Sequence, residues 1–331
     1  MDAKARALFD GVLVWDAHSC LPLKPGIDVD VLERHRAAGI DYVSINVGMD
    51  FNPWPDCLRV LAAFRAHLQR HPNRYVLVDT TADVARAQRE GKLAVAFDLE
   101  GSDMLDGDLD MLRLYHDLGV RQIHFAYNRD NAVGGGCHGA DVGLTAFGRR
   151  LVREVNEVGL IMDCSHTGHR SSLEIIAASA KPVVFSHTCV AALKAHPRNV
   201  RDDQIDACAA NGGVVGITGI GVFLGANQTE TAIVLDHVAY VADRVGPRHV
   251  GIGLDFEFLA GVDDFPKTAK RGDWWPAAHY GGAGLGPVKF VQPEQMAEIA
   301  EGLLARGWPE ADVAGVLGGN FLRVAEATWR A

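Results

Sequence analysis

The sequence has no long apolar run and no block of basic residues. None of its 331 residues lies in an uninterrupted apolar stretch of about 18, the length that a membrane-spanning helix needs. Residues 1–11 also lack the apolar segment of a secretory signal. A net charge of −10 and a pI near 5.7 argue against nucleic acid and anionic membranes, because both attract basic proteins. We expect a cytoplasmic protein with a small-molecule partner. Monomer and homodimer both remain open.

The cysteines show no CxxC spacing, and no Pro- or Ser-rich linker interrupts the chain. In a large acidic chain without an export signal, scattered cysteines are typical of free thiols. They are Cys20, Cys57, Cys137, Cys164, Cys189 and Cys208. The even composition predicts one domain over residues 1–331.

Short apolar runs alternate with amphipathic helical patterns along most of the chain. The runs predicted to be strands are 12–15, 42–47, 93–97, 122–126, 160–163, 183–185, 214–217 and 250–253. The predicted helices include 30–38, 57–70, 108–118, 145–158, 169–180, 202–210 and 229–245. Repeated βα units of this length favour a (β/α)8 TIM-like barrel with extra terminal helices. An open doubly wound sheet is the alternative. It is disfavoured because no glycine-rich phosphate turn follows the first strand.

Residues able to bind a metal follow five of the predicted strands. They are His18, Glu100, His166, His187 and Asp255. Singly, such a His can be structural, Glu100 can cap a helix and Asp255 can form a turn. In a parallel barrel, however, all C-terminal strand ends meet at one face. Three imidazoles and two carboxylates gathered there would form a zinc-type ligand set with one base left over.

Seven sequence features in the same order are similar to those of a known family. They are D-A-H-S-C-L-P at 16–22, F-D-L-E-G at 97–101, the segment 143–159, the 21-position spacing of His166 and His187, R-N-V-R-D-D at 198–203, V-G-I-G-L-D-F-E at 250–257, and G-G-N-F-L-R-V at 318–324. Together they resemble the renal (membrane) dipeptidase family of the amidohydrolase superfamily, which consists of barrel enzymes with a binuclear zinc centre.

The resemblance implies a zinc-dependent dipeptidase that cleaves an amide bond with a metal-bound hydroxide. It places His18 on one zinc ion, Glu100 as a bridge between two ions, and His166 with His187 on the other. It also implies that Asp255 handles the catalytic proton. Arg198 would bind the substrate carboxylate; the alternative is an exposed Arg198 paired with Asp202 or Asp203.

Two positions depart from the family pattern. The family's His-x-Asp reads His18-Ser19-Cys20, so Cys20 either supplies a thiolate ligand or is a small buried residue that binds no metal. In the second case we expect one zinc ion instead of two. A family His near the substrate is replaced by Tyr127, which can donate a hydrogen bond but carries no positive charge. His124 is a candidate to compensate for that loss.

Three functions remain open at this stage. The first is a zinc dipeptidase, and the second is a related hydrolase of a lactone, a cyclic amide or an N-acyl amino acid. The third is a catalytically silent barrel protein that binds a ligand. Two segments are expected to form specificity loops or to pack the barrel rim or a subunit interface: 134–139, and 263–286 with Trp274, Trp275, His279 and Tyr280.

Overall fold

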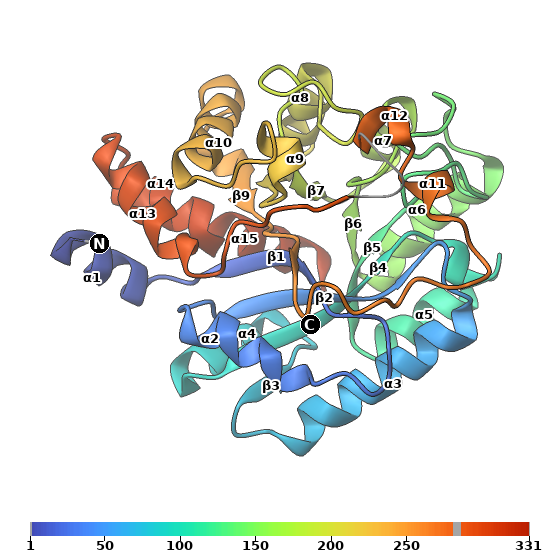
Figure 1. Cartoon of the computed structure of the whole chain (residues 1–331), viewed down its shortest axis with the longest axis horizontal. Coiled ribbons are helices and arrows are strands. Elements are labelled where there is room, and N and C mark those ends of the chain that lie inside the picture. The colour runs from blue at the N-terminus through green and yellow to red at the C-terminus, as the bar shows by residue number, and fades with distance from the viewer. Residues whose placement is uncertain (1, 281–285, 331) are drawn as a thin grey trace.

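The fold is a curled sheet of parallel strands surrounded by helices (Figure 1). The computed structural model describes residues 2–280 and 286–330. The strand order is β10-β1-β2-β4-β5-β6-β7-β8-β9, and β3 pairs with the start of β4. The strands are β1 (Trp15–Cys20), β2 (Tyr42–Met49), β3 (Tyr75–Leu77), β4 (Leu93–Glu100), β5 (Val120–His124), β6 (Ile161–Asp163), β7 (Val183–Thr188), β8 (Val214–Ile217), β9 (Val250–Ile252) and β10 (Phe256–Glu257).

The two ends of this sheet are joined by one short chain segment. The main-chain N–H of Gly253, just after β9, donates to the carbonyl of Ile217 in β8. Two residues on, the N–H of Asp255 donates to the carbonyl of His18 in β1, and β10 then pairs with the end of β1. The segment therefore bridges the first and last strand positions, which confirms the predicted TIM-like barrel.

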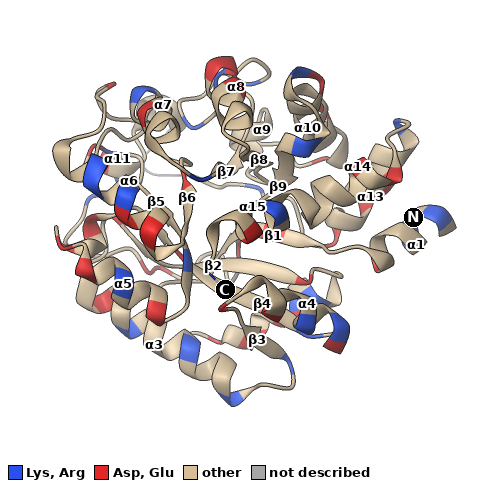
Figure 2. Cartoon of the chain, turned by 180° about the vertical axis from the view of Figure 1, so that it is seen from behind, with Lys and Arg blue, Asp and Glu red and all other residues tan. Residues whose placement is uncertain are grey.

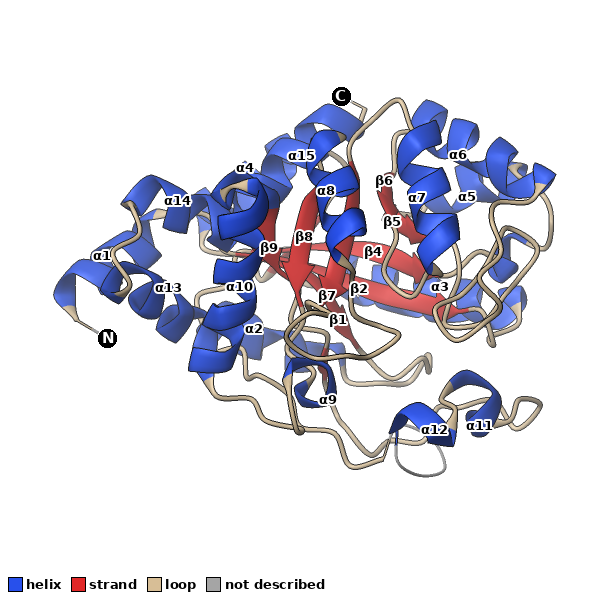
Figure 3. Ribbon diagram, turned by 90° about the horizontal axis from the view of Figure 1, so that it is seen from above, coloured by secondary structure: helices blue, strands red, loops and turns tan. Residues whose placement is uncertain are grey.

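Helices form the outer layer around the strands (Figure 3). They are α1 (Ala3–Gly11), α2 (Glu33–Ala37), α3 (Trp54–Arg70), α4 (Thr81–Glu90), α5 (Asp110–Asp117), α6 (Ala146–Val158), α7 (His169–Ala178), α8 (Asp202–Ala210), α9 (Gly221–Leu224), α10 (Thr231–Val245), α11 (Arg271–Trp274), α12 (Ala277–Tyr280), α13 (Gln295–Ala305), α14 (Glu310–Ala314) and α15 (Asn320–Thr328). Short 3-10 turns are η1 (Val29–Leu32), η2 (Asp103–Leu105) and η3 (Pro247–His249), and η4 (Gly315–Gly319) is a π-helical turn. Helices at both ends of the chain agree with the predicted terminal additions.

Strand β4 shows how the sequence divides the barrel interior from the helical layer. Leu93, Val95, Phe97 and Leu99 belong to the large cluster that packs against the helices. The intervening Ala94 and Ala96 belong to a second cluster, which Phe321 of α15 joins. Because side chains alternate along a strand, Asp98 and Glu100 continue the inward row. The interior is thus apolar at one end and polar at the other.

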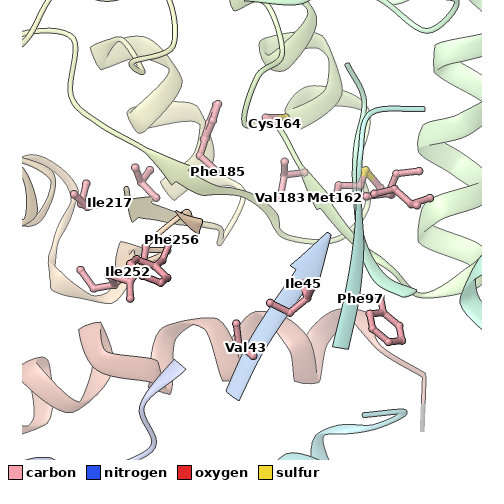
Figure 4. Packing of buried hydrophobic residues seen from close by; sticks show 14 of the residues in the cluster. Val43, Ile45, Phe97, Met162, Cys164, Val183, Phe185, Ile217, Ile252 and Phe256 are labelled. Atoms are coloured by element: carbon pink, nitrogen blue, oxygen red, sulfur yellow. The ribbon is translucent and has the colours of Figure 1, made fainter. Parts of the chain in front are cut away.

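The large cluster is continuous between neighbouring strands and their helices. Figure 4 shows Val43 and Ile45 projecting from β2 near Phe97 of β4. Helix α6 adds an amphipathic face to this layer, with Leu151, Val152, Val155 and Val158 all buried. It begins where the Thr145 side chain accepts the N–H of Gly148 and ends at Gly159, whose φ of 94° suits glycine.

The structure corrects several of the predicted elements. The first strand is Trp15–Cys20, not 12–15, because pairing with β2 begins at Trp15 and the partly buried Val12 and Leu13 belong to the connection from α1, so His18 and Cys20 lie within the strand. Two short strands were not predicted: Tyr75–Leu77 with 3 residues and Phe256–Glu257 with 2 residues. The helix predicted at 30–38 is η1 followed by α2. The other boundaries shift by a few residues.

Acidic and basic residues are interspersed on the outer helices, as Figure 2 shows for α3, α5 and α6. All six cysteines are free, as predicted. Within residues 2–280 and 286–330, no helix combines the length and the apolar composition needed to cross a bilayer.

Two leucines on α5 test the packing of the helical layer. Leu112 is fully buried, whereas Leu114 is 41% exposed. Leu112→Ala should lower the free energy of unfolding by about 3 kcal/mol, because it removes buried methyl groups and leaves a cavity. The matched Leu114→Ala should cost less than about 0.5 kcal/mol. Chemical denaturation measures both, and equal effects would contradict this assignment of the buried face.

Candidate active site

Four predicted ligands meet at the polar end of the barrel around the carboxylate of Glu100. Its Oε1 lies 2.6 Å from Nε2 of His18, and its Oε2 lies 3.6 Å from Nε2 of His166. Nε2 of His187 lies 2.9 Å from Nε2 of His166. The two oxygens of one carboxylate therefore face two different imidazoles, those of His18 and His166, as a bridging ligand requires.

Each imidazole is held from behind by a polar side chain. Nδ1 of His18 lies 3.2 Å from Asp98, and Nδ1 of His187 lies 2.7 Å from the Ser186 hydroxyl. Nδ1 of His166 lies 2.7 Å from Oδ1 of Asn128, whose amide nitrogen donates to the Trp274 carbonyl at 3.0 Å. That second bond fixes the orientation of the Asn128 amide, so His166 must donate from Nδ1. Its Nε2 lone pair then faces the cluster, as metal ligation needs.

Cys20 and Asp255 complete the cluster. The Cys20 sulfur lies 3.4 Å from Nε2 of His18, 3.6 Å from Glu100 and 3.8 Å from Asp255. The other Asp255 oxygen lies 4.0 Å from Nε2 of His187. Asp255 and His166 both have positive φ, 53° and 65°, outside regular strand geometry. Cys20 is therefore close enough to share an ion with His18 and Asp255.

The electrostatics of the site reflect buried opposite charges. Burial lowers the pKa of His18, but Asp98 and Glu100 outweigh it and raise that pKa well above its usual value. Burial alone would raise the pKa of Glu100, yet His18 holds it below its usual value. Positive charge is thus favoured between these carboxylates. A divalent cation would satisfy the same requirement.

His166 and His187 behave in the opposite way. Burial lowers the pKa of both well below the usual value, and Arg198 and His18 lower it further. Both rings are therefore neutral near pH 7, the form of histidine that binds metals. Burial raises the pKa of the Cys20 thiol well above its usual value, so Cys20 would become a thiolate only by coordinating a cation.

A cavity of about 500 Å³ opens above the cluster. Cys20, Glu100, His166 and Asp255 form part of its lining. Tyr127 also lines it, and its ring stacks on His166 at a centroid distance of 4.2 Å. Aromatic residues cover one wall; they are Phe51, Phe265, Trp275 and Tyr127. The cavity therefore combines polar ligands at its floor with an apolar wall, as small-molecule sites do.

Arg198 is not an exposed surface residue. Only 3% of it is exposed, and its Nη2 lies 3.1 Å from Nε2 of His166 and donates to the His187 carbonyl. Asp202 instead pairs with Arg244, and Asp203 with His169. The alternative of a surface ion pair is therefore wrong.

His124 does not take the place of the missing family histidine. Its ring lies below the cavity and is fully buried; Nδ1 is 2.8 Å from the Leu99 carbonyl and Nε2 is 2.8 Å from Asp163. Both nitrogens are thus engaged by the barrel interior. The suggested compensation by His124 is wrong for this reason.

A model of the membrane dipeptidase family (peptidase family M19) matches residues 34–270. The chain belongs to this family. It is 35% identical over 210 residues to a dipeptidase of Clonostachys rogersoniana, a match covering 60% of this chain and 53% of that protein. It is 33% identical over 223 residues to an uncharacterized dipeptidase of Schizosaccharomyces pombe, covering 64% and 52%. The chain therefore spans about half the length of these curated relatives.

A solved structure is similar over nearly the full length. An amidohydrolase from Pseudomonas aeruginosa superimposes with a TM-score of 0.89 at 28% identity, covering 98% of this chain and 99% of that one. The fold, including its terminal helices, is thus shared with that amidohydrolase over nearly the whole of both chains.

The polar partners behind the ligands were not predicted from the sequence. Asp98 precedes Glu100 by two positions on β4, so strand alternation alone could have placed it on the inward row. Asn128 gave no such signal, because it follows β5 in an irregular segment with φ of 62°.

The glycine of F-D-L-E-G has a local explanation. Gly101 has φ of 126°, and a Cβ there would lie 2.0 Å from the Asp50 carboxylate. That carboxylate accepts the main-chain N–H groups of Ser102, Asp103 and Tyr127. Asp50 thereby ties the chain after Glu100 to the chain that carries Tyr127.

The segments expected to form loops surround the cavity mouth. The segment predicted at 263–286 contains the short helices α11 and α12, and its residues 281–285 lie outside the described part of the chain. Trp274 and Trp275 pack with Tyr127 on the rim. In the 134–139 segment, Nε2 of His138 lies 2.9 Å from the Tyr280 hydroxyl, which joins the two segments.

Asn128 offers a test of how His166 is oriented. Asn128→Gly keeps the positive φ accessible but removes the hydrogen-bond acceptor, so zinc affinity should fall about 10- to 100-fold. Asn128→Asp retains an acceptor and should recover most of that affinity. Competition with a chelating dye measures both. Equal zinc affinity in Asn128→Gly and the unmodified protein would remove Asn128 from this role.

Proposed function

We propose that this protein is a zinc-dependent hydrolase that cleaves the amide bond of a dipeptide or a closely related small amide. The main support for this proposal is the position of the Glu100 carboxylate, whose two oxygens face His18 and His166 at the floor of a cavity. Family membership and the relatives named dipeptidases support the substrate class. The partly aromatic cavity suits a small molecule.

The donors fit two zinc ions. His18, Cys20 and Glu100 would hold the first ion, and His166, His187 and the other Glu100 oxygen would hold the second. Imidazole, thiolate and carboxylate are all common zinc ligands. When bound there, zinc would supply Lewis acidity, which activates water near neutral pH and polarises a carbonyl oxygen.

The protein's own side chains would move the proton and position the substrate. Asp255 faces the cluster from the β9–β10 junction, where it can accept a proton from water and return it to the leaving nitrogen. The Tyr127 hydroxyl would donate to the developing oxyanion. Arg198 would bind the substrate carboxylate; its guanidinium lies over the ring of Phe223, a residue of the cavity lining, at 5.4 Å.

Two other functions are separated from this one by experiment. A related hydrolase would share the ligands but act on a lactone, a cyclic amide or an N-acyl amino acid. A silent binding protein would have no need for Asp255 beside the ligands. Metal analysis of purified protein should give two zinc equivalents in the cavity, and a dipeptide library with both stereochemistries at the C-terminal residue should give turnover. Bound zinc without dipeptide turnover would favour the related hydrolase, and no bound metal would contradict both hydrolase assignments.

Asp255 and His187 should respond differently to substitution. Asp255→Asn fits the positive φ and should keep the metal while lowering kcat roughly 10²- to 10⁴-fold, because the amide cannot accept the proton. His187→Ala should lose one metal ion together with activity. Metal content and turnover are measured on the same preparations. An unchanged kcat in Asp255→Asn would exclude it as the base.

Metal coordination by Cys20 can be detected spectroscopically in cobalt-substituted protein. If its sulfur is a ligand, Co²⁺ will give a thiolate charge-transfer band in the near ultraviolet, since only a bound thiolate produces it. Cys20→Ser should lose the band, whereas Cys57→Ser, on α3 and outside the cavity lining, should keep it. If the spectrum of the unmodified protein lacks this band, Cys20 is not a ligand, and the first ion would be held by His18 and Glu100 without it.

A further inference from the structure

A second group of metal-type ligands lies on the helical layer, outside the cavity lining. His67 lies in the last turn of α3, and His71, four positions later, is the residue that caps the C-terminal end of that helix. Asp30 of η1 meets them there: Nε2 of His67 lies 2.9 Å from its Oδ1. The two rings have centroids 4.3 Å apart, and one ligand atom from each of the three residues lies within 4.8 Å of the other two.

Hydrogen bonds from neighbouring groups orient His71 and Asp30 so that they can coordinate a metal. Nδ1 of His71 lies 2.9 Å from the His67 carbonyl, which can only accept, so the ring donates from Nδ1 and the Nε2 lone pair of His71 is free. The Tyr75 hydroxyl donates to Oδ1 of Asp30, and Arg74 pairs with Oδ2 at 2.8 Å. Outer hydrogen bonds of this kind hold a carboxylate ligand in place.

The local charge also accommodates a cation. The positive charge of Arg74 alone would oppose a bound cation. The negative charges of Asp30 and Glu33, however, act on this guanidinium and help to raise its pKa. Glu33 pairs with Arg36 through Oε2 only. Its Oε1 is buried and, within the part of the chain that the structure describes, has no hydrogen-bond partner. The Glu33 carboxylate is thus ion-paired with Arg36 but keeps one oxygen without a hydrogen bond.

We propose that Asp30, His67 and His71 bind one zinc ion, or a similar borderline divalent metal, separately from the cavity. Two imidazoles and one carboxylate are a common zinc ligand set, and water would fill the fourth position. The proton shared between Nε2 of His67 and Asp30 must leave that nitrogen, and in the neutral ring it moves to Nδ1. The ion would tie η1 to α3 and stabilise the folded state by linkage.

The test is a zinc titration of full-length protein whose cavity sites are already loaded. Calorimetry should detect one further equivalent, and His71→Ala should weaken it at least tenfold while leaving dipeptide turnover unchanged. His116→Ala is the matched control: His116 also lies near the end of a helix and beside a carboxylate, with Nδ1 3.5 Å from Asp117, but it has no second imidazole partner in the described structure. It should bind zinc as the unmodified protein does.

A second variant keeps the result interpretable. If His71→Ala folds poorly, His67→Gln should show the same loss. With the cavity sites already loaded, further zinc should raise Tm in the unmodified protein but in neither variant. His187→Ala should retain this equivalent, because the cavity ligands are not involved. Equal stoichiometry and affinity in His71→Ala and the unmodified protein would overturn the proposal, as would the absence of any further equivalent.

Discussion

The hydrogen bonds behind the ligand imidazoles are the constraint on which the candidate site depends. Asp98 on β4 fixes His18 on β1, and its Oδ2 also accepts the hydroxyl of Ser44 on β2 at 2.6 Å. Asn128, which follows β5, fixes His166, which follows β6. Asp98 and Asn128 each come from a different strand or strand end than the ring they hold, whereas Ser186 is the neighbour of His187 on β7. The register of the parallel strands therefore determines the direction in which the lone pairs of the ligand rings point.

Barrel closure places the proposed proton acceptor beside these ligands. Asp16 accepts the N–H of Leu254 at 2.7 Å, and its other oxygen lies 2.8 Å from Nε2 of His35. This buried carboxylate ties the segment that carries Asp255 to the strand that carries His18. The apolar half of the interior, filled by Trp15, Tyr42 and Phe321, supports the fold. Because the apolar half supplies this packing, the polar half of the interior can contain the buried charged side chains of the site.

The sequence predicted the parts of the site that follow from strand periodicity. Alternating apolar runs located the barrel strands, and the residues after them located Glu100, His166, His187 and Asp255. Prediction from the sequence failed for the elements and residues whose structure depends on tertiary contacts. Strand β1 carries the buried polar residues Asp16 and His18, whose partners His35 and Asp98 are distant in sequence, so β1 was placed too early. The short β3 and the role of Asn128 depend on neighbours far away in the chain, and no local pattern encodes them.

The most direct measurement is an anomalous difference map at the zinc edge from crystals of the zinc-loaded protein. The account predicts strong peaks at the cavity floor, one beside His18 and Glu100 and one beside His166 and His187. A map with no peak among these four side chains, in crystals whose zinc content is otherwise stoichiometric, would contradict it.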